Sequence, residues 1–141
     1  MNHMTNWISG VDLSTLAEVE RCGGVFRERG READAMTLLH ERGANLVRLR
    51  LWNDPYSPKG EPYGAGTCDL NCVLSLALRA KTLGMDWMLD FHYSDFWADP
   101  GKQRLPKAWV GLDEDGLVQA VYSYTAQVLA TLRDRGAAPG M

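Results

Sequence analysis

Three short apolar runs predict β-strands. They cover residues 7–13 (WISGVDL), 45–52 (NLVRLRLW) and 86–93 (DWMLDFHY). Each run has the length of a strand and is rich in β-branched or aromatic residues. Between the runs, apolar residues recur with the helical period, which predicts helices over 31–42, 69–83 and 114–135. Glycines that can close a helix in the left-handed conformation follow these segments: Gly43, Gly84 and Gly136.

The order of these segments is strand then helix, three times over. Such βαβ repetition favours a parallel sheet with right-handed crossovers. The helix-to-strand links are short, whereas the strand-to-helix links at 13–30, 53–68 and 93–113 are long. Functional sites of α/β proteins lie in the loops at the carboxyl ends of their strands, so this asymmetry indicates a working surface at that end.

The two faces of the predicted strands differ in polarity. In the second strand Val47, Leu49 and Leu51 alternate with Arg48, Arg50 and Trp52, and in the third strand Asp90 and His92 lie opposite Leu89 and Phe91. One apolar face suits covering helices, and charge near the strand ends is typical of the mouth of a (β/α)8 barrel. No G-x-G-x-x-G turn follows the first strand, which argues against an open dinucleotide-binding sheet.

We therefore expect an α/β fold of the (β/α)8 TIM barrel family. At about 40 to 50 residues per unit, the chain holds only the first three βα units of such a barrel. Residues 1–141 are expected to form the N-terminal part of a single barrel domain, truncated before strand four.

Composition and charge narrow the function. The chain is 45% hydrophobic, 23% charged and has a net charge of −3, and it has no clustered basic run, so we expect no nucleic-acid partner. No apolar stretch approaches the roughly 20 residues of a membrane span. The opening MNHMTNWISG lacks the layout of a signal peptide, so the chain is expected to be cytoplasmic as given, or secreted if its true leader is missing.

Charged side chains gather at the predicted strand ends. Asp12 ends the first strand, Arg48 and Arg50 lie near the end of the second, and His92 ends the third. In a barrel these ends converge on one pocket, where the cations would keep nearby carboxylates ionised. The alternative is a structural ion network at the barrel mouth.

Tryptophans in the same loops suggest a carbohydrate cleft. Trp52, Trp97 and Trp109 all lie in or beside strand-to-helix loops. Flat aromatic rings suit the apolar face of a sugar, and the neighbouring polar groups suit its hydroxyls. Packing within the long loops is an equally good explanation for each tryptophan.

The sequence shows no obvious pair of catalytic carboxyl groups. Glycoside hydrolysis needs two carboxyl groups beside the bond, yet no glutamate falls at a predicted strand end. No Ser/His or Cys/His nucleophile stands out, and no metal-binding motif is present. Cys68 and Cys72 share the spacing of one helix face, and packing explains them better than a metal site.

Four segments resemble glycoside hydrolase family 53, the arabinogalactan endo-β-1,4-galactanases. They read GVDLSTL, LVRLRLWNDP, DFHYSDFWADPGKQ followed by PKAW, and AVYSYTAQVLATL. The resemblance implies a retaining barrel glycosidase that cleaves internal β-1,4-galactosyl bonds in the galactan side chains of pectin. It places the acid/base and nucleophile glutamates beyond Met141, so we expect the chain to be inactive alone. It implies no cofactor, and β-1,4-galactan or a galacto-oligosaccharide as the ligand. Some members of the family bind a calcium ion in later loops that are absent from this chain, so we expect no metal here.

The resemblance also implies roles for individual residues. An arginine of the second strand orients the nucleophile, and its spacing to Trp52 favours Arg48 over Arg50 without deciding between them. His92 lines the subsite beside the catalytic pair. The implied substrate-binding or supporting residues are Asp12, Arg48, Arg50, Trp52, Asn53, His92, Asp95, Trp97 and Asp99.

Two alternatives remain. The chain could be a non-catalytic remnant that binds galactan or a partner, or it could belong to another member of the clan, such as a mannanase or cellulase. The loop DFHYSDFWADPGKQ argues against the second alternative. Because a three-unit piece leaves the outer edges of its first and third strands unpaired, we also expect self-association.

Overall fold

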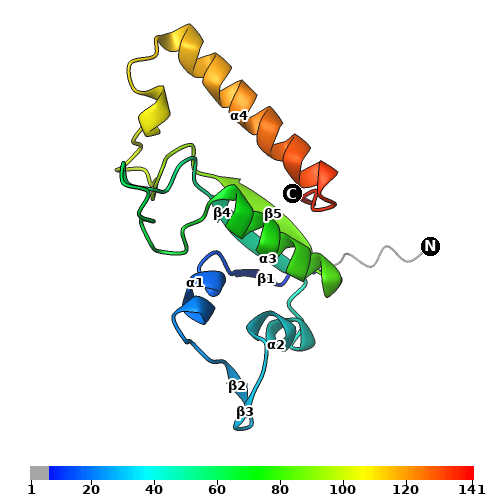
Figure 1. The fold of residues 1–141 in the computed structure, drawn as a ribbon. Coiled ribbons are helices and arrows are strands. Elements are labelled where there is room, and N and C mark those ends of the chain that lie inside the picture. Colours follow the sequence, from blue (N-terminus) through cyan, green and yellow to red (C-terminus); the bar gives the residue numbers. More distant parts are fainter. Residues whose placement is uncertain (1–6) are drawn as a thin grey trace, which may run out of the picture.

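A parallel three-stranded sheet carries the fold. The computed structural model describes residues 7–141, so the expectation about a signal peptide rests largely on residues 1–6, which lie outside the described part. The strands are β1 (Gly10–Asp12), β4 (Leu46–Leu51) and β5 (Asp86–Phe91), in the spatial order β1-β4-β5. Both pairs of neighbouring strands are parallel, as the repetition of strand and helix predicts (Figure 1).

The predicted helices are present with small shifts at their ends. They are α2 (Ala35–Glu41), α3 (Leu70–Thr82) and α4 (Glu114–Asp134). Each begins at an aspartate whose side chain accepts a hydrogen bond from a backbone N–H of the first turn; these caps are Asp34, Asp69 and Asp113. The three closing glycines have positive φ angles of 96°, 75° and 72°, which confirms the prediction for the helix ends.

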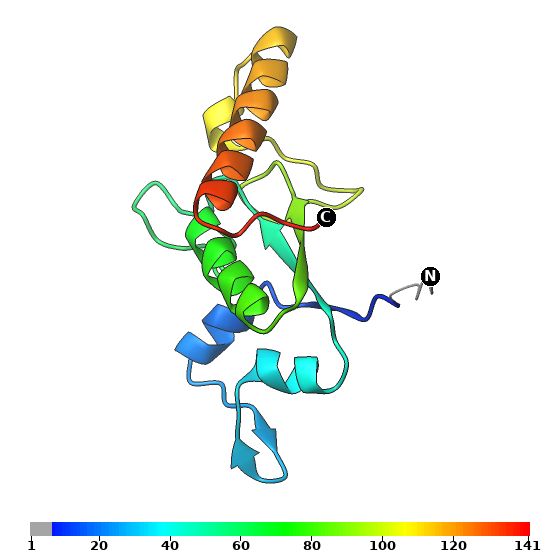
Figure 2. The ribbon, with the colours of Figure 1, turned by 90° about the vertical axis from the view of Figure 1, so that its right-hand side faces the viewer.

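The first strand-to-helix connection differs from the prediction. It contains a short helix, α1 (Leu16–Arg21), and a hairpin of β2 (Arg27–Glu28) and β3 (Arg31–Glu32). The helix predicted to begin at residue 31 therefore begins at 35. The hairpin turns at Arg29 and Gly30, both with positive φ, and this turn overrides the helical pattern. Figures 1 and 2 place the hairpin at the end of the molecule away from α4.

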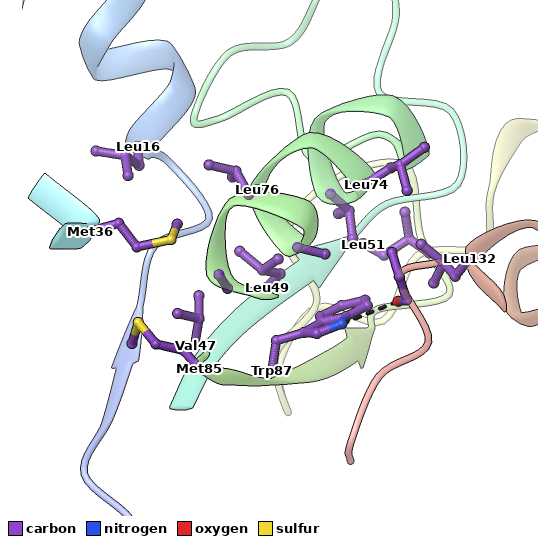
Figure 3. Close-up of a cluster of buried hydrophobic side chains, with 14 of the residues drawn as sticks. Leu16, Met36, Val47, Leu49, Leu51, Leu74, Leu76, Met85, Trp87 and Leu132 are labelled. Atoms are coloured by element: carbon purple, nitrogen blue, oxygen red, sulfur yellow. Dashed lines mark hydrogen bonds between the residues drawn. The ribbon is translucent and has the colours of Figure 1, made fainter. Parts of the chain in front are cut away.

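The core lies between the sheet and α3. Val47, Leu49 and Leu51 are fully buried on the face of β4 that α3 covers, as the alternation along this strand predicts. Figure 3 shows α1 and α2 closing one end of this core through Leu16 and Met36. Successive side chains of a strand point to opposite faces of the sheet. Because the apolar side chains of β4 pack against α3, the alternating polar side chains lie on the opposite face.

The segment that follows α4 lies along the free edge of β5. The Gly140 N–H donates to the Trp87 carbonyl at 3.0 Å, and the Leu89 N–H donates to the Met141 carbonyl at 3.0 Å. The Trp87 indole N–H also donates to the carbonyl of Ala137 at 3.2 Å (Figure 3). The outer edge of the third predicted strand is thus partly paired. The expectation of a free edge there is wrong, because helix α4 returns the chain to that edge.

Helix α4 offers a test of how firmly this segment is held. Leu132 is fully buried, whereas Leu129 on the same helix is 41% exposed. We expect Leu132→Ala to lower the free energy of unfolding by about 2–5 kcal/mol, and Leu129→Ala by less than about 1 kcal/mol. Urea unfolding of both variants measures these two losses of stability. Both variants replace leucine by alanine in the same helix, so their changes in helix propensity match. Equal losses would mean that α4 does not pack on the sheet.

Candidate functional site

Arg48 joins all three parallel strands near their carboxyl ends. One terminal nitrogen of its guanidinium lies 2.5 Å from Asp12 of β1, and the other lies 2.5 Å from Asp90 of β5. In the parallel register Asp12 lies beside Arg48, and Asp90 lies beside Arg50, two residues further along β4 on the same face. The Arg48 guanidinium therefore reaches both carboxylates. Asp90 was not predicted as a site residue. Its position on the same strand face as His92 could have indicated that it belongs to the site.

Asp12 is held as a carboxylate. Burial by itself would raise its pKa, but hydrogen bonds from Ser14 and the nearby guanidinium groups of Arg50 and Arg48 outweigh it. The net effect is a pKa below the usual value of 3.8. The Ser14 hydroxyl also accepts a hydrogen bond from the backbone N–H of Arg50 at 2.9 Å, so Ser14 ties the end of β1 to β4.

Both ring nitrogens of His92 have partners within the protein. The Trp52 indole N–H donates to Nδ1 at 3.1 Å, and the backbone N–H of Ala98 reaches the same atom at 3.3 Å. Because an indole N–H can only donate, Nδ1 is an acceptor and the ring proton lies on Nε2. Nε2 then donates to Asp90 at 2.9 Å. His92 therefore links the Asp12–Arg48–Asp90 cluster to the aromatic residues of the loops.

Arg50 occupies a different environment from Arg48. It is 6% exposed, and its contacts to Asp12 and to the Cys68 sulfur are long, at 3.5 and 3.9 Å. Its guanidinium carbon lies 4.0 Å from the centre of the Trp97 ring. Its Nε atom is buried and has no partner within residues 7–141. Arg50 thus has loosely engaged hydrogen-bonding capacity, whereas both terminal nitrogens of Arg48 are taken by carboxylates.

The tryptophans divide into supporting and exposed side chains. Trp52 is fully buried beneath Phe96 and Trp97, with ring centroids 4.9 and 5.7 Å away, so it supports the loop. Trp97 is 43% exposed and presents its ring at the surface. Trp109 is buried against Tyr124 and Tyr93, so packing within the loop explains its position. Only Trp97, of these three tryptophans, is placed to stack on a ligand.

The loop after β5 starts with a strained residue. Tyr93 has a φ of +48°, a backbone conformation that residues other than glycine rarely adopt. Its hydroxyl is hydrogen-bonded to the Thr125 hydroxyl of α4 at 2.8 Å. The turn at this residue directs the following segment back over the strand ends. Burial, the largest cause, raises the pKa of the neighbouring Tyr124, so this aromatic group stays uncharged.

Asp95 fastens this loop to the loop after β4. It accepts hydrogen bonds from the backbone N–H groups of Asp54 and Lys107, at 3.0 and 2.7 Å, and from the Lys107 ammonium at 3.0 Å. The backbone N–H of Asn53 donates to the Ser94 carbonyl at 2.8 Å, which adds a second link. Asp95 is buried, and these contacts give it a supporting position. Lys107 was missed in the sequence because nothing local marks it as a partner.

The remaining predicted residue, Asp99, lies at the opening. It lines a hollow of about 570 Å³ together with Arg48, Asp90 and His92, and its carboxylate accepts a hydrogen bond from the Gly101 N–H at 2.7 Å. The hollow adjoins the strand ends, so the structure brings Asp12, the two arginines, His92 and the loop residues into one region. The assignment of these residues to substrate binding stays a prediction.

The cysteines lie behind this region. Cys68 is buried below Arg50, and burial raises the pKa of both the Cys68 and Cys72 thiols, that of Cys72 to about 11. Their position fits packing. Residues 7–141 contain no group of three or more His, Cys, Asp or Glu side chains able to hold a metal ion. No helix in this described part is long and apolar enough to cross a membrane.

Parallel strands with helices between them, and a polar site at the carboxyl strand ends, define a barrel-type α/β protein. Residues 8–141 match glycosyl hydrolase family 53. The chain therefore belongs to this family.

Relatives and solved structures agree with this assignment. The chain is 40% identical to an endo-β-1,4-galactanase of Bacillus subtilis and 41% identical to an arabinogalactan endo-β-1,4-galactanase of Cellvibrio japonicus. These matches cover 96% and 97% of the chain. It superposes on the family 53 catalytic domain of Ignisphaera aggregans with a TM-score of 0.92, at 45% identity and over 95% of its length. The prediction of a barrel-family fold with about three βα units is confirmed.

The chain spans only part of these proteins. It covers 32% of the Bacillus relative, 35% of the Cellvibrio relative and 38% of the Ignisphaera domain. Its match therefore concerns the part of the barrel that carries β1, β4 and β5.

The Asp12 carboxylate gives a testable pH dependence. Because its pKa is lowered in the folded chain, it stabilises the fold at pH values above its usual pKa of 3.8. This stability is lost as the pH falls through the folded pKa. We expect Asp12→Asn to be less stable than the wild type near neutral pH, and to lose less further stability on acidification. Thermal unfolding between about pH 6 and pH 2.5 measures this.

Asp115→Asn provides the control, because Asp115 is an exposed carboxylate in the first turn of α4. A wild-type acid profile in Asp12→Asn would show that the cluster does not depend on this charge.

Proposed function

We propose that this chain is the sugar-binding N-terminal part of a retaining endo-β-1,4-galactanase. The observation that carries the proposal is the exposed Trp97 ring, stacked on the Arg50 guanidinium beside the Asp12–Arg48–Asp90 cluster. Such a ring takes the apolar face of a galactosyl unit, while the charged groups take its hydroxyls. Membership of family 53 and the galactanase names of the relatives support galactan as the polymer.

The reaction of this enzyme class needs two carboxyl groups about 5 Å apart. No glutamate of residues 7–141 lies at the carboxyl end of β1, β4 or β5. For example, Glu20 binds Arg79, Glu32 binds Arg27 and Glu18 binds the Gly66 N–H. We therefore assign the acid/base and the nucleophile to glutamates outside these residues. The mechanism is double displacement with retention, and it needs no cofactor.

Arg50 is the better candidate for holding the nucleophile. A carboxylate entering the site would compete with two short ion pairs at Arg48, but only with long contacts at Arg50. The stacking of Trp97 on Arg50 also orients the guanidinium. In this proposal Arg48 holds the strand ends together, and the buried Arg50 has the hydrogen-bonding capacity left to orient the nucleophile.

Galacto-oligosaccharide binding tests the proposal. We expect β-1,4-galactotetraose to bind the chain saturably, and Trp97→Ala to weaken binding about tenfold because the stacking surface is lost. Trp7→Ala is the matched control, because Trp7 is 85% exposed and precedes β1 at the opposite end of the sheet. Isothermal titration calorimetry measures both. The proposal fails if galactotetraose does not bind, or if manno- or cello-oligosaccharides bind equally well.

The second candidate function is a non-catalytic galactan-binding protein. The observation in its favour is that the described residues place the exposed Trp97 ring over Arg50 without a glutamate at the carboxyl ends of β1, β4 and β5. Reducing-sugar release from galactan by the product of the complete reading frame separates the two candidates. Hydrolysis supports the galactanase, and saturable binding without hydrolysis supports the binding protein.

We further propose that the chain self-associates. Within residues 7–141 strand β1 has β4 as its one neighbour, and Val118 and Tyr122 on α4 are 66% and 70% exposed. An apolar helix face of this kind favours association. Analytical ultracentrifugation over a concentration series is expected to give a mass that rises with concentration, and Val118→Lys is expected to reduce the rise. A constant monomer mass at all concentrations would contradict the proposal.

A further inference from the structure

Two adjoining hollows lie on the outer side of the loops after β4 and β5. Their volumes are about 600 and 410 Å³, and both are lined by Ser94, Phe96 and Arg104. Trp97 and Lys102 complete the first hollow, and Tyr63 and Lys107 border the second. Since Trp97 also borders the site described above, the hollows continue the proposed sugar-binding surface away from the strand ends.

Aromatic rings form walls of both hollows. Tyr63 and Phe96 are each 39% exposed, and their rings stand nearly perpendicular with centroids 6.0 Å apart. Phe96 rests on the buried Trp52, which holds it in place. A rigid, half-exposed ring at the edge of a hollow provides a stacking surface at low entropic cost.

The cations of these hollows differ in how they are paired. The Lys107 ammonium lies 3.0 Å from Asp95 and 3.5 Å from Asp54, and it sits 5.1 Å from the Tyr63 ring centre. Lys102 and Arg104 have no carboxylate within 4.0 Å and no side-chain hydrogen bond in the described part of the chain. Lys107 is thus a structural cation, whereas Arg104 and Lys102 are available to a ligand.

The acidic groups nearby offset only part of this positive charge. Asp95 is engaged by Lys107 and by two backbone N–H groups. Asp99 lines the first hollow and accepts a hydrogen bond from the Gly101 N–H, and its negative charge offsets one of the two cations, Lys102 and Arg104. An arginine that shares a hollow with an aromatic ring suits a flat-faced ligand that carries a carboxylate, because guanidinium and carboxylate form paired hydrogen bonds.

We propose that the Phe96–Arg104 hollows bind an acidic sugar, a uronic acid unit whose carboxylate is held by Arg104 and whose ring lies on Phe96. The inference rests on the proposed function in one respect, that the ligand is a carbohydrate. A polysaccharide that carries both neutral and acidic units would then contact Trp97 with the former and Arg104 with the latter. The net charge of −3 and the small number of free cations disfavour a highly charged polyanion.

The test compares an acidic trisaccharide, trigalacturonate, with a neutral tetrasaccharide, galactotetraose, on the 141-residue chain. We expect trigalacturonate to bind saturably, with an affinity that falls as salt is raised from about 50 to about 300 mM. Arg104→Gln is expected to weaken trigalacturonate binding about tenfold. Arg104 also lines the hollow of about 570 Å³ with Arg48 and His92, but galactotetraose has no carboxylate to pair with it, so its binding is expected to weaken much less. Arg104 makes no contact that the fold needs, so this variant is expected to keep the wild-type circular dichroism spectrum.

Arg31→Gln is the matched control, because it removes the same charge from an exposed position of the hairpin. Phe96→Ala tests the stacking wall, with Val110→Ala as a control for the loss of an exposed apolar side chain. The inference is overturned if trigalacturonate does not bind, if Arg31→Gln weakens binding as much as Arg104→Gln, or if inorganic phosphate competes at equal concentration.

The outcomes separate this inference from the proposed function. Binding of galactotetraose through Trp97 without binding of trigalacturonate would leave the proposed function standing and reject the acidic-sugar site. Binding of trigalacturonate through Arg104 without binding of galactotetraose would support the site and reject galactan as the ligand.

Discussion

The bridge that Arg48 makes between Asp12 and Asp90 is the interaction on which the site depends. It spans the three parallel strands at the edge where they end, and the strand register sets its geometry. His92 extends the bridge through its Nε2–H to Asp90, and its Nδ1 holds the Trp52 indole. A single hydrogen-bonded path therefore connects the first strand to the aromatic loop, so that the position of Trp97 depends on the ion pairs beneath it.

This arrangement follows from how the sheet divides its two faces. The side chains of Val47, Leu49 and Leu51 are used for packing against α3, which leaves the alternate positions of the same strand for charge. Burying Arg50 would be costly without compensation, and Asp12 and the Trp97 ring provide it. The polar network and the apolar core are thus two consequences of one alternating pattern.

The long loops act as part of a packed structure. Asp95 joins the loops after β4 and β5, while Trp52 and Trp109 fill their interiors. These loops expose the aromatic rings of Trp97, Phe96 and Tyr63. Loops fixed in this way can present rings to a ligand with little loss of conformational freedom on binding.

The sequence by itself determined the three parallel strands, their three long helices and the face on which the charges lie, because these depend on local periodicity and on glycines at helix ends. It did not reveal the hairpin at β2 and β3, where two turn residues with positive φ overrode a helical pattern. Only the tertiary structure decided that Trp52 is buried while Trp97 is exposed, and that Asp90 and Lys107 belong to the site region. These properties depend on contacts between residues about 40 or more positions apart, or across loops, which no local pattern encodes.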